Sequence, residues 1–319
     1  MAGPQSWGVG RSILRSGDAQ QADGCHHGFI MRALPLQPLE PAAQRPRWLL
    51  RGVVAGLAAL LGYVSLETQQ RKWIFQAQRS DVAYERVDRY DRWIEFVSSE
   101  TGAPVQLHGR WLAQPRADAP VLLYLHGARC DLPESAERMQ LWHELGFAVL
   151  GIDYRGFGRS SPALPSERTA CEDARAAWQW LAQQHPRARR FVYGHSLGGA
   201  IAVQLASEVD DATGLIVEGT FTSIPEVFET MKWGWLPLKQ LITQRFDSAQ
   251  RVLQVRVPTL VVHGSDDRLI HPELGRALYE LATAPKRFVL VQGGSHHDTH
   301  VVGQSQYRQA LRELFGLVV

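Results

Sequence analysis

The stretch Gly194-His195-Ser196-Leu197-Gly198 is the part of this 319-residue chain that most constrains its fold. It follows the apolar run at 190–193 and precedes small and apolar residues at 199–202, which suit a helix. A strand that enters a helix through Gly-x-Ser-x-Gly turns sharply and presents the serine hydroxyl at the tip of the turn, because glycine tolerates the crowding there. The pattern therefore predicts a nucleophilic serine at position 196.

Composition indicates one large globular domain with additional segments. The residues are 45% apolar, enough for a substantial core, and 34 basic against 32 acidic residues leave a formal charge of +2. This balance creates no field that favours nucleic acid, and we expect no such partner. Cys25, Cys130 and Cys171 are too scattered for a disulfide framework and lack metal-ligand spacing. We expect neither a metal nor a cofactor, since no phosphate-binding glycine loop or flavin signature is present.

The N-terminal part reads as a leader followed by an apolar segment. Residues 1–47 are rich in Gly, Pro, Gln and Arg and predict a disordered leader. Residues 52–66 carry no charge, and together with residues 48–51 they reach the length of a short transmembrane helix. A cleaved signal peptide and a buried helix are the alternatives, but no small-residue cleavage site is evident before Glu67. We expect an uncleaved single-pass anchor at 48–66.

Charges around the anchor bear on its orientation. The flanking basic residues are Arg32, Arg45, Arg47 and Arg51 before it and Arg71, Lys72, Arg79 and Arg86 after it. The two counts are equal, but the residues on the N-terminal side are more closely spaced, which favours a cytoplasmic leader. The expected location is therefore the membrane, with the catalytic domain outside the cytoplasm, in the periplasm if the source is bacterial.

Residues 67–319 alternate β-branched runs with helix-like stretches, which predicts an α/β domain with a mostly parallel, doubly wound sheet. Runs 93–97 and 105–112 alternate apolar with polar residues and suit an antiparallel pair. Continuous apolar runs that suit strands buried on both faces follow at 121–125, 148–152, 191–193, 215–217, 259–262 and 288–291. The clearest helical pattern spans 172–181.

A serine nucleophile needs a histidine base, which in turn needs a carboxylate to orient it. The strand at 259–262 is followed by Asp266 and Asp267, and the strand at 288–291 by His296 and His297. The order Ser, Asp, His along the chain is that of the α/β hydrolases. Either carboxylate and either histidine fits these positions.

The reaction intermediate also needs two donors for its oxyanion. The first is the amide of Leu197, which directly follows the nucleophile. The second is expected in the loop after the strand at 121–125, where we choose the amide of Ala128. The two amides complete the predicted site.

Taken together, the motifs resemble the Bem46-like branch of the α/β hydrolases over about residues 70–316. The resemblance is carried by residues 124–127, 153–160, 194–199, 221–225, 245–248, 263–267 and 294–299. It implies that Asp267 is the acid and His296 the base, and that one N-terminal apolar helix anchors the chain. The chain departs from the family in having His297 where Asn is usual, and Ala128-Arg129-Cys130 where relatives often have Asn-Ala-Gly.

Residues 221–253, between the sixth and seventh strands, stand where these enzymes insert a small helical cap. Its apolar residues are Met231, Trp233, Trp235, Leu236, Leu238, Leu241 and Ile242, which either cover an acyl chain or pack the cap on the sheet.

The predicted function is hydrolysis of a carboxylic ester or thioester in a small or lipid-like acyl substrate by Ser196, His296 and Asp267. The alternatives are a serine aminopeptidase-type peptidase and a catalytically inactive, membrane-tethered binding protein. The sequence does not indicate an oligomeric state.

Overall fold

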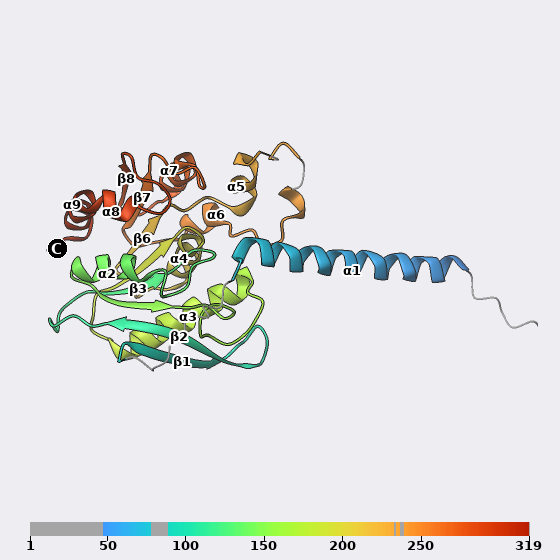
Figure 1. Cartoon of the computed structure of the whole chain (residues 1–319), viewed down its shortest axis with the longest axis horizontal. Helices are drawn as coiled ribbons and strands as arrows, with labels where there is room; N and C mark the ends of the chain where they lie inside the picture. Colours follow the sequence, from blue (N-terminus) through green and yellow to red (C-terminus); the bar gives the residue numbers. More distant parts are fainter. Residues whose placement is uncertain (1–46, 78–88, 233, 237–238, 319) are drawn as a thin grey trace, which may run out of the picture. The chain divides into compact units, whose positions relative to one another are not determined.

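The computed structural model describes residues 47–77, 89–232, 234–236 and 239–318 (Figure 1). Of the predicted leader, only Arg47 lies within the described residues. Four other residues named above lie outside them: Arg79, Arg86, Trp233 and Leu238.

In the described chain, eight strands form one sheet in the order β1-β2-β4-β3-β5-β6-β7-β8. They are β1 (Asp91–Val97), β2 (Pro104–Leu112), β3 (Val121–Leu125), β4 (Ala148–Ile152), β5 (Arg190–His195), β6 (Gly214–Glu218), β7 (Thr259–Gly264) and β8 (Lys286–Val291). Strand β2 is antiparallel to β1 and β4, and the remaining neighbours are parallel. Every predicted strand run falls within an observed strand, so the mostly parallel, doubly wound sheet is confirmed.

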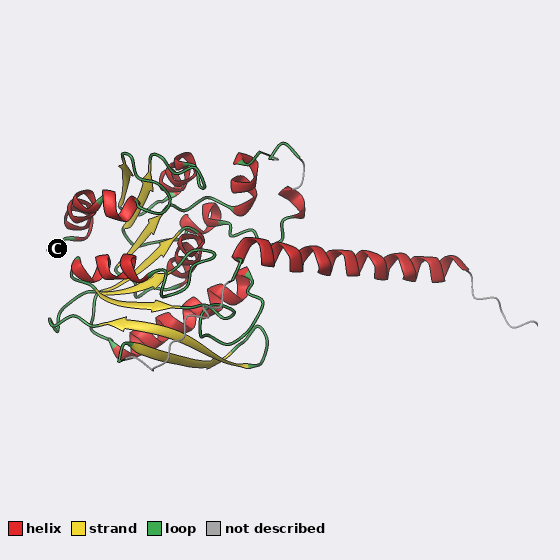
Figure 2. Ribbon diagram, viewed as in Figure 1, coloured by secondary structure: helices red, strands yellow, loops and turns green. Residues whose placement is uncertain are grey.

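Helices cover both faces of this sheet (Figure 2). They are α2 (Ala136–Glu144), α3 (Glu167–Gln184), α4 (Leu197–Glu208), α5 (Ile224–Thr230), α6 (Ser248–Val252), α7 (Pro272–Leu281), α8 (Thr299–Val302) and α9 (Gln304–Phe315), with a 3₁₀ turn at Lys239–Leu241. Alternate residues of β3 point to opposite faces. Leu123 packs in a core with α3, α4, α6 and α7, whereas Tyr124 packs in a second core with α2 and α9. Burial on both faces explains why the parallel strands read as continuous apolar runs.

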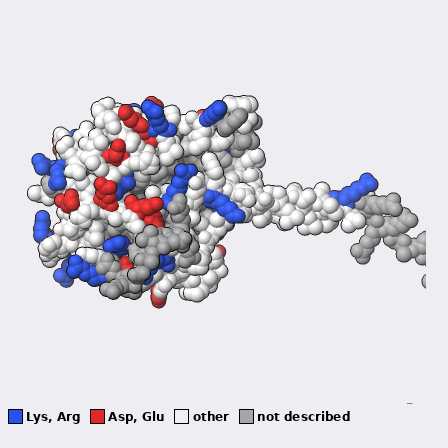
Figure 3. Space-filling view, in the orientation of Figure 1, with Lys and Arg blue, Asp and Glu red and all other residues white. Residues whose placement is uncertain are grey.

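Helix α1 (Arg47–Phe75) is apolar and exposed along its first part. Its exposed apolar side chains are Trp48, Leu49, Leu50, Val53, Val54, Leu57, Leu60, Leu61, Tyr63, Val64 and Leu66. Figure 3 shows most of this helix without charged side chains. Among the described helices it is the one long and apolar enough to cross a membrane, by length and composition.

The last turns of α1 are bound to the sheet domain. Gln70 Nε2 donates to Leu241 O (2.7 Å), and Phe75 is fully buried with its ring 5.9 Å from that of Phe246. The helix ends at Phe75 rather than at Leu66. The predicted boundary at residue 67 therefore falls inside a continuous helix, near the point where the helix begins to contact the domain.

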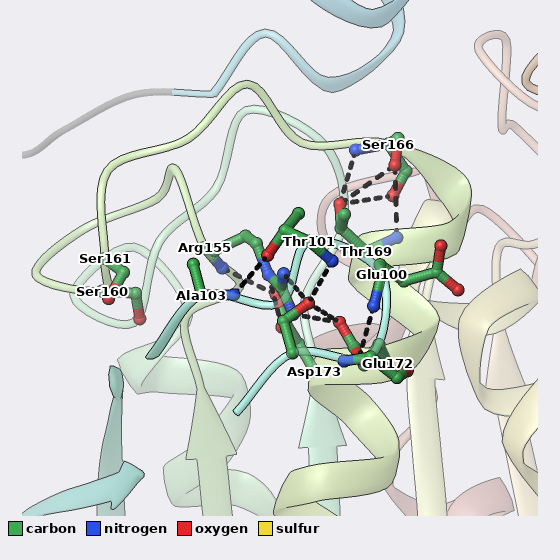
Figure 4. Close-up of polar contacts among 12 residues, drawn as sticks. Glu100, Thr101, Ala103, Arg155, Ser160, Ser161, Ser166, Thr169, Glu172 and Asp173 are labelled. Carbon is green, nitrogen blue, oxygen red and sulfur yellow. Dashed lines mark hydrogen bonds and ion pairs between the residues drawn. The ribbon is translucent and has the colours of Figure 1, made fainter. Parts of the chain in front are cut away.

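A buried polar cluster joins β1, β4 and α3 (Figure 4). Arg155, in the loop after β4, donates to Asp173 Oδ1 (Nε, 2.8 Å) and to Glu172 Oε2 (2.7 Å). Burial raises the pKa of Asp173 to about 6, although hydrogen bonds and the charge of Arg155 oppose the rise. Burial also favours neutral Glu172, but hydrogen bonds from Ser98, Ser99 and Arg155 lower its pKa to about 2. The cluster fixes the start of α3 beneath the loop that follows β4.

We predict that Arg155→Ala lowers the free energy of unfolding by about 3–5 kcal/mol, because it leaves two buried carboxylates without their cation. Urea unfolding of the detergent-solubilised chain measures this change. The control is Arg116→Ala, whose partner Asp118 is exposed, and it should unfold at the wild-type midpoint. Equal midpoints for both variants would show that the buried cluster does not stabilise the fold.

Candidate active site

Ser196 occupies a strained turn between β5 and α4. Its φ of +55° and ψ of −122° lie in a region that non-glycine residues rarely adopt. The end of β6 and the residues after it hold this conformation, since Ser196 N–H donates to Glu218 O (2.9 Å) and Thr220 Oγ1 donates to Ser196 O (2.9 Å). The hydroxyl-bearing residue is therefore fixed by its backbone.

The glycines around Ser196 leave no room for a side chain. A Cβ atom at Gly194 would lie 2.1 Å from Gly198 O, and one at Gly198 would lie 2.2 Å from Leu125 O. Both contacts are with backbone, which cannot move aside without displacing β3 or α4. The Gly-x-Ser-x-Gly spacing is thus a packing requirement of the turn, as the sequence predicted.

His296 and Asp267 form a hydrogen-bonded pair. His296, in the loop after β8, has its Nδ1 2.7 Å from Oδ2 of Asp267, which follows β7. The other oxygen of Asp267 accepts the backbone N–H groups of Leu269 (3.0 Å) and Ile270 (2.8 Å). Because a carboxylate accepts from Nδ1–H, the lone pair of His296 lies on Nε2. His296 therefore has the tautomer that a general base requires.

Asp267 is buried and held in its charged form. Burial alone would raise its pKa, but hydrogen bonds from His263, His296 and the Ile270 amide outweigh it and hold the pKa well below the usual range. His263 Nε2 lies 3.3 Å from Asp267 Oδ2 and 2.9 Å from Ile270 O. The carboxylate therefore contacts two histidine rings, of which the sequence predicted one.

Ser196 and His296 line the same cavity, of about 230 Å³. Its apolar lining includes Phe221, Ile224, Val227, Phe228 and Met231 from the predicted cap, and Trp73 and Ile74 from α1. Among the described residues no hydrogen bond joins Ser196 Oγ to His296. Such bonds are often long until substrate is bound. The cavity brings an apolar surface to the hydroxyl and the imidazole.

Two buried side chains hold the backbone of the histidine loop. His195 Nε2 donates to His296 O (3.0 Å), and Arg138 donates to His297 O (3.2 Å). Arg138 is paired with the buried Glu218, 3.2 Å away, whose other oxygen accepts the hydroxyls of Tyr193 (2.7 Å) and Tyr307 (2.6 Å). Burial raises the pKa of Glu218, but the charge of Arg138, the neighbouring His300 and the hydrogen bonds from Tyr307 and Tyr193 together outweigh burial, so the net shift in its pKa is downward. Sequence analysis missed this network, although a charged residue ending the apolar run of β6 was a signal for it.

The predicted oxyanion donors lie next to Ser196. The backbone of Gly127 packs against the serine, since a Cβ at Gly127 would lie 3.1 Å from Ser196 Cβ. Within the described chain, the amides of Leu197 and Ala128 donate no hydrogen bond to another protein group. Both residues line the cavity. The two amides are therefore available to a substrate oxygen.

The two candidate acids and the two candidate bases that the sequence left open lie in different surroundings. Asp267 and His296 contact each other, whereas Asp266 and His297 are exposed, and Asp266 accepts a hydrogen bond from Ser265 Oγ. Among the described residues no group of three His, Cys, Asp or Glu side chains could hold a metal ion. The polar groups of the residues that line the cavity include the Ser196 hydroxyl, imidazoles, the Arg129 guanidinium and the Cys130 thiol.

Comparison with known proteins places this chain in a family. The model of the family described as serine aminopeptidase, S33, matches residues 116–251. An uncharacterized protein of Mycobacterium tuberculosis is 37% identical over 195 residues, which cover 60% of this chain and 68% of that protein. The lysophosphatidylserine lipase ABHD12 of Danio rerio is 33% identical over 186 residues, 52% of this chain and 48% of the lipase. Protein bem46 of Schizosaccharomyces pombe is 30% identical over 188 residues, covering 56% and 62% of the two chains.

A solved structure supports the same fold. An esterase of Pyrococcus furiosus superposes with a TM-score of 0.61 at 19% identity, covering 75% of this chain and 98% of the esterase. The sheet order, the turn at Ser196 and these matches define a hydrolase of the α/β-hydrolase class. Within that class, the chain belongs to the Bem46-like branch.

Burial of His195 makes the stability of the folded chain depend on pH. Burial first, and then the nearby positive charge of Arg138, holds the pKa of His195 well below its ordinary value of 6.5. The folded chain therefore keeps this ring neutral while the unfolded chain protonates it, so stability is lost as the pH falls through about 6.5.

We predict that His195→Gln, which retains a donor for His296 O but cannot titrate, removes about 1.4 kcal/mol of the stability difference between pH 7.5 and pH 5.5. Urea unfolding of the wild type and the variant at both pH values measures it. If the variant and the wild type show the same difference in stability between the two pH values, His195 takes up a proton in the folded chain as it does in the unfolded chain.

Proposed function

We propose that the chain is a serine hydrolase that cleaves carboxylic ester or thioester bonds, with Ser196 as nucleophile, His296 as general base and Asp267 as its orienting acid. The observation that carries the proposal is the 2.7 Å contact between His296 Nδ1 and Asp267 Oδ2 in the wall of the cavity that Ser196 also lines. A buried carboxylate stabilises the imidazolium that forms when His296 accepts a proton.

In the proposed mechanism Ser196 Oγ attacks the acyl carbon while His296 Nε2 takes its proton. The amides of Leu197 and Ala128 donate to the oxyanion of the tetrahedral intermediate. His296 then gives the proton to the departing alcohol or thiol, and an acyl group remains on Ser196. A water molecule, deprotonated by His296, attacks this acyl-enzyme; the bond from the acyl carbon to Ser196 Oγ breaks, His296 returns the proton to Ser196 Oγ, and the acid leaves.

An apolar acyl chain is the proposed substrate feature. Aromatic and aliphatic side chains of residues 221–231 line the cavity beside Ser196, which suits hydrocarbon. The names of the relatives include a lipase and an esterase, which agrees with an ester substrate. The matching family model is described as an aminopeptidase, so a peptidase is the second candidate. Hydrolysis of aminoacyl-naphthylamides without hydrolysis of acyl esters would favour that candidate.

We predict that Ser196→Ala and His296→Ala each lower turnover of a p-nitrophenyl acyl ester by several powers of ten, since removal of one triad member disables the unit. Labelling by a fluorophosphonate probe should disappear in Ser196→Ala.

The matched control is His297→Ala, the exposed neighbour of His296, which should retain turnover within about tenfold. Loss of activity in His297→Ala with retention in His296→Ala would reassign the base. Unlabelled wild-type protein would favour a binding protein with an inactive hydrolase fold.

We further propose that α1 is a single-pass membrane anchor, with residues 1–47 as a leader, residues 67–319 as the catalytic domain and residues 221–253 as its cap. The exposed apolar surface of α1 supports the anchor, because a helix that is apolar all round is unstable in water. Placing the catalytic domain outside the cytoplasm rests on the closer spacing of arginines before the helix.

We predict that Leu57→Arg combined with Leu61→Arg releases the full chain from membranes, because each arginine costs about 2.5–3.5 kcal/mol near the centre of a spanning helix. Membrane pellets washed with alkaline carbonate measure the retained fraction. The control is Val97→Arg, which places the same charge on an exposed apolar residue of β1 and should leave the chain in the pellet. Retention of the double variant would exclude α1 as the anchor.

A further inference from the structure

The cavity beside Ser196 contains one permanently charged side chain. Among the described residues that line it, Arg129 carries a positive charge and no residue is a carboxylate. The buried Asp267 lies behind His296 and does not line the cavity. Apart from Arg129 and the three histidines, His195, His296 and His297, the lining residues are apolar or uncharged. A substrate that enters meets a cation with no compensating anion.

The position of Arg129 is fixed by its backbone. Its N–H donates to Phe75 O at the end of α1 (3.0 Å), and its φ of +67° holds the loop in a turn next to Ala128, the proposed oxyanion donor. Its side chain is exposed, and its guanidinium forms no hydrogen bond or ion pair with the described part of the chain. The charge is thus available one residue from the place where the scissile carbonyl oxygen is proposed to bind.

Three other arginines of this domain are bound to protein partners. Arg138 pairs with Glu218, Arg155 with Asp173, and Arg71 donates to Pro165 O. Arg129 differs because it combines exposure with a place in the wall of the cavity. It is also part of the segment Ala128-Arg129-Cys130, where the chain departs from the usual sequence of its relatives.

We propose that Arg129 is a specificity-determining residue that binds an anionic group, phosphate or carboxylate, on the alcohol portion of an acyl ester. The proposal rests on the ester hydrolysis proposed above and names its substrate class as anionic amphiphiles. The apolar lining from the cap takes the hydrocarbon chain, and guanidinium N–H groups bind the anion in a bidentate manner. A neutral ester of the same chain length lacks this contact.

A binding experiment tests the proposal without requiring turnover. Octyl phosphate, octanoate and octanol share a chain length and differ in the charged group, and Trp73 in the cavity wall provides a fluorescence signal. For Arg129→Gln in the full, detergent-solubilised chain we expect at least tenfold weaker binding of octyl phosphate, octanoate or both, and unchanged binding of octanol. The ratio of phosphate to carboxylate affinity in the wild type identifies the preferred anion. Arg129→Lys should give intermediate affinity for the phosphate, because it keeps the charge and loses the fork.

The matched control is Arg268→Gln, an exposed arginine near the site that does not line the cavity. It should bind all three amphiphiles as the wild type does. Equal losses for the three amphiphiles in Arg129→Gln, no loss for either anion, or the same anion-specific loss in Arg268→Gln would overturn the proposal.

A kinetic arm separates this inference from the proposed function. Hydrolysis of 1-oleoylglycerol and 1-oleoylglycerol 3-phosphate should both require Ser196, and Arg129→Gln should raise KM at least tenfold for the phosphate alone. Retained hydrolysis with no change in this preference refutes the role of Arg129. Selective anion binding by the wild type without hydrolysis of any ester refutes the esterase function and leaves the role of Arg129 supported.

Discussion

The turn at Ser196 is the constraint on which the rest of the site depends. A φ of +55° at a serine persists only where its surroundings enforce it, and here β3, β6 and α4 all contact the turn. Because a Cβ at Gly198 would strike Leu125 O, the first turn of α4 must lie against the end of β3. This contact sets the proposed oxyanion loop beside the hydroxyl. The strain is therefore the means by which two separate loops are brought to one reacting centre.

Buried carboxylates at the carboxyl ends of the strands complete the arrangement. Asp153 after β4 accepts the amide of Leu132 (2.9 Å), Glu218 ending β6 binds Arg138, and Asp267 after β7 binds His296. Each is buried and hydrogen-bonded, and each binds a different loop. The loop after β3 and the loop after β8 are consequently held by hydrogen bonds to buried side chains. Preorganised donors and bases of this kind stabilise developing charge without reorganisation.

The sequence predicted the sheet well because strands buried on both faces appear as continuous apolar runs, and these runs are too short to be helices. It also predicted the turn at Ser196 and candidates for the acid and the base, and the choice of Asp267 over Asp266 and of His296 over His297 came from family resemblance. His263, Arg138 and Trp73 could not be predicted. Their roles arise from contacts between segments far apart in the chain, such as Arg138 with His297 O, which no local pattern encodes. The continuation of α1 to Phe75 was not predicted either, because its last turns are polar and are held by tertiary contacts.

Those last turns connect the apolar helix to the chemistry. Trp73 and Ile74 line the cavity, Phe75 O accepts the amide of Arg129, and Gln70 bonds to Leu241 and to Thr243 N (2.8 Å). Residues 70–75 thus belong to the hydrolase domain as much as β1 does, and a catalytic domain that began after residue 75 would lack part of the cavity wall. The end of α1 is hydrogen-bonded directly to the backbone next to Ala128, through Arg129 N–H and Phe75 O. The last turns of the helix are therefore a structural part of the candidate site.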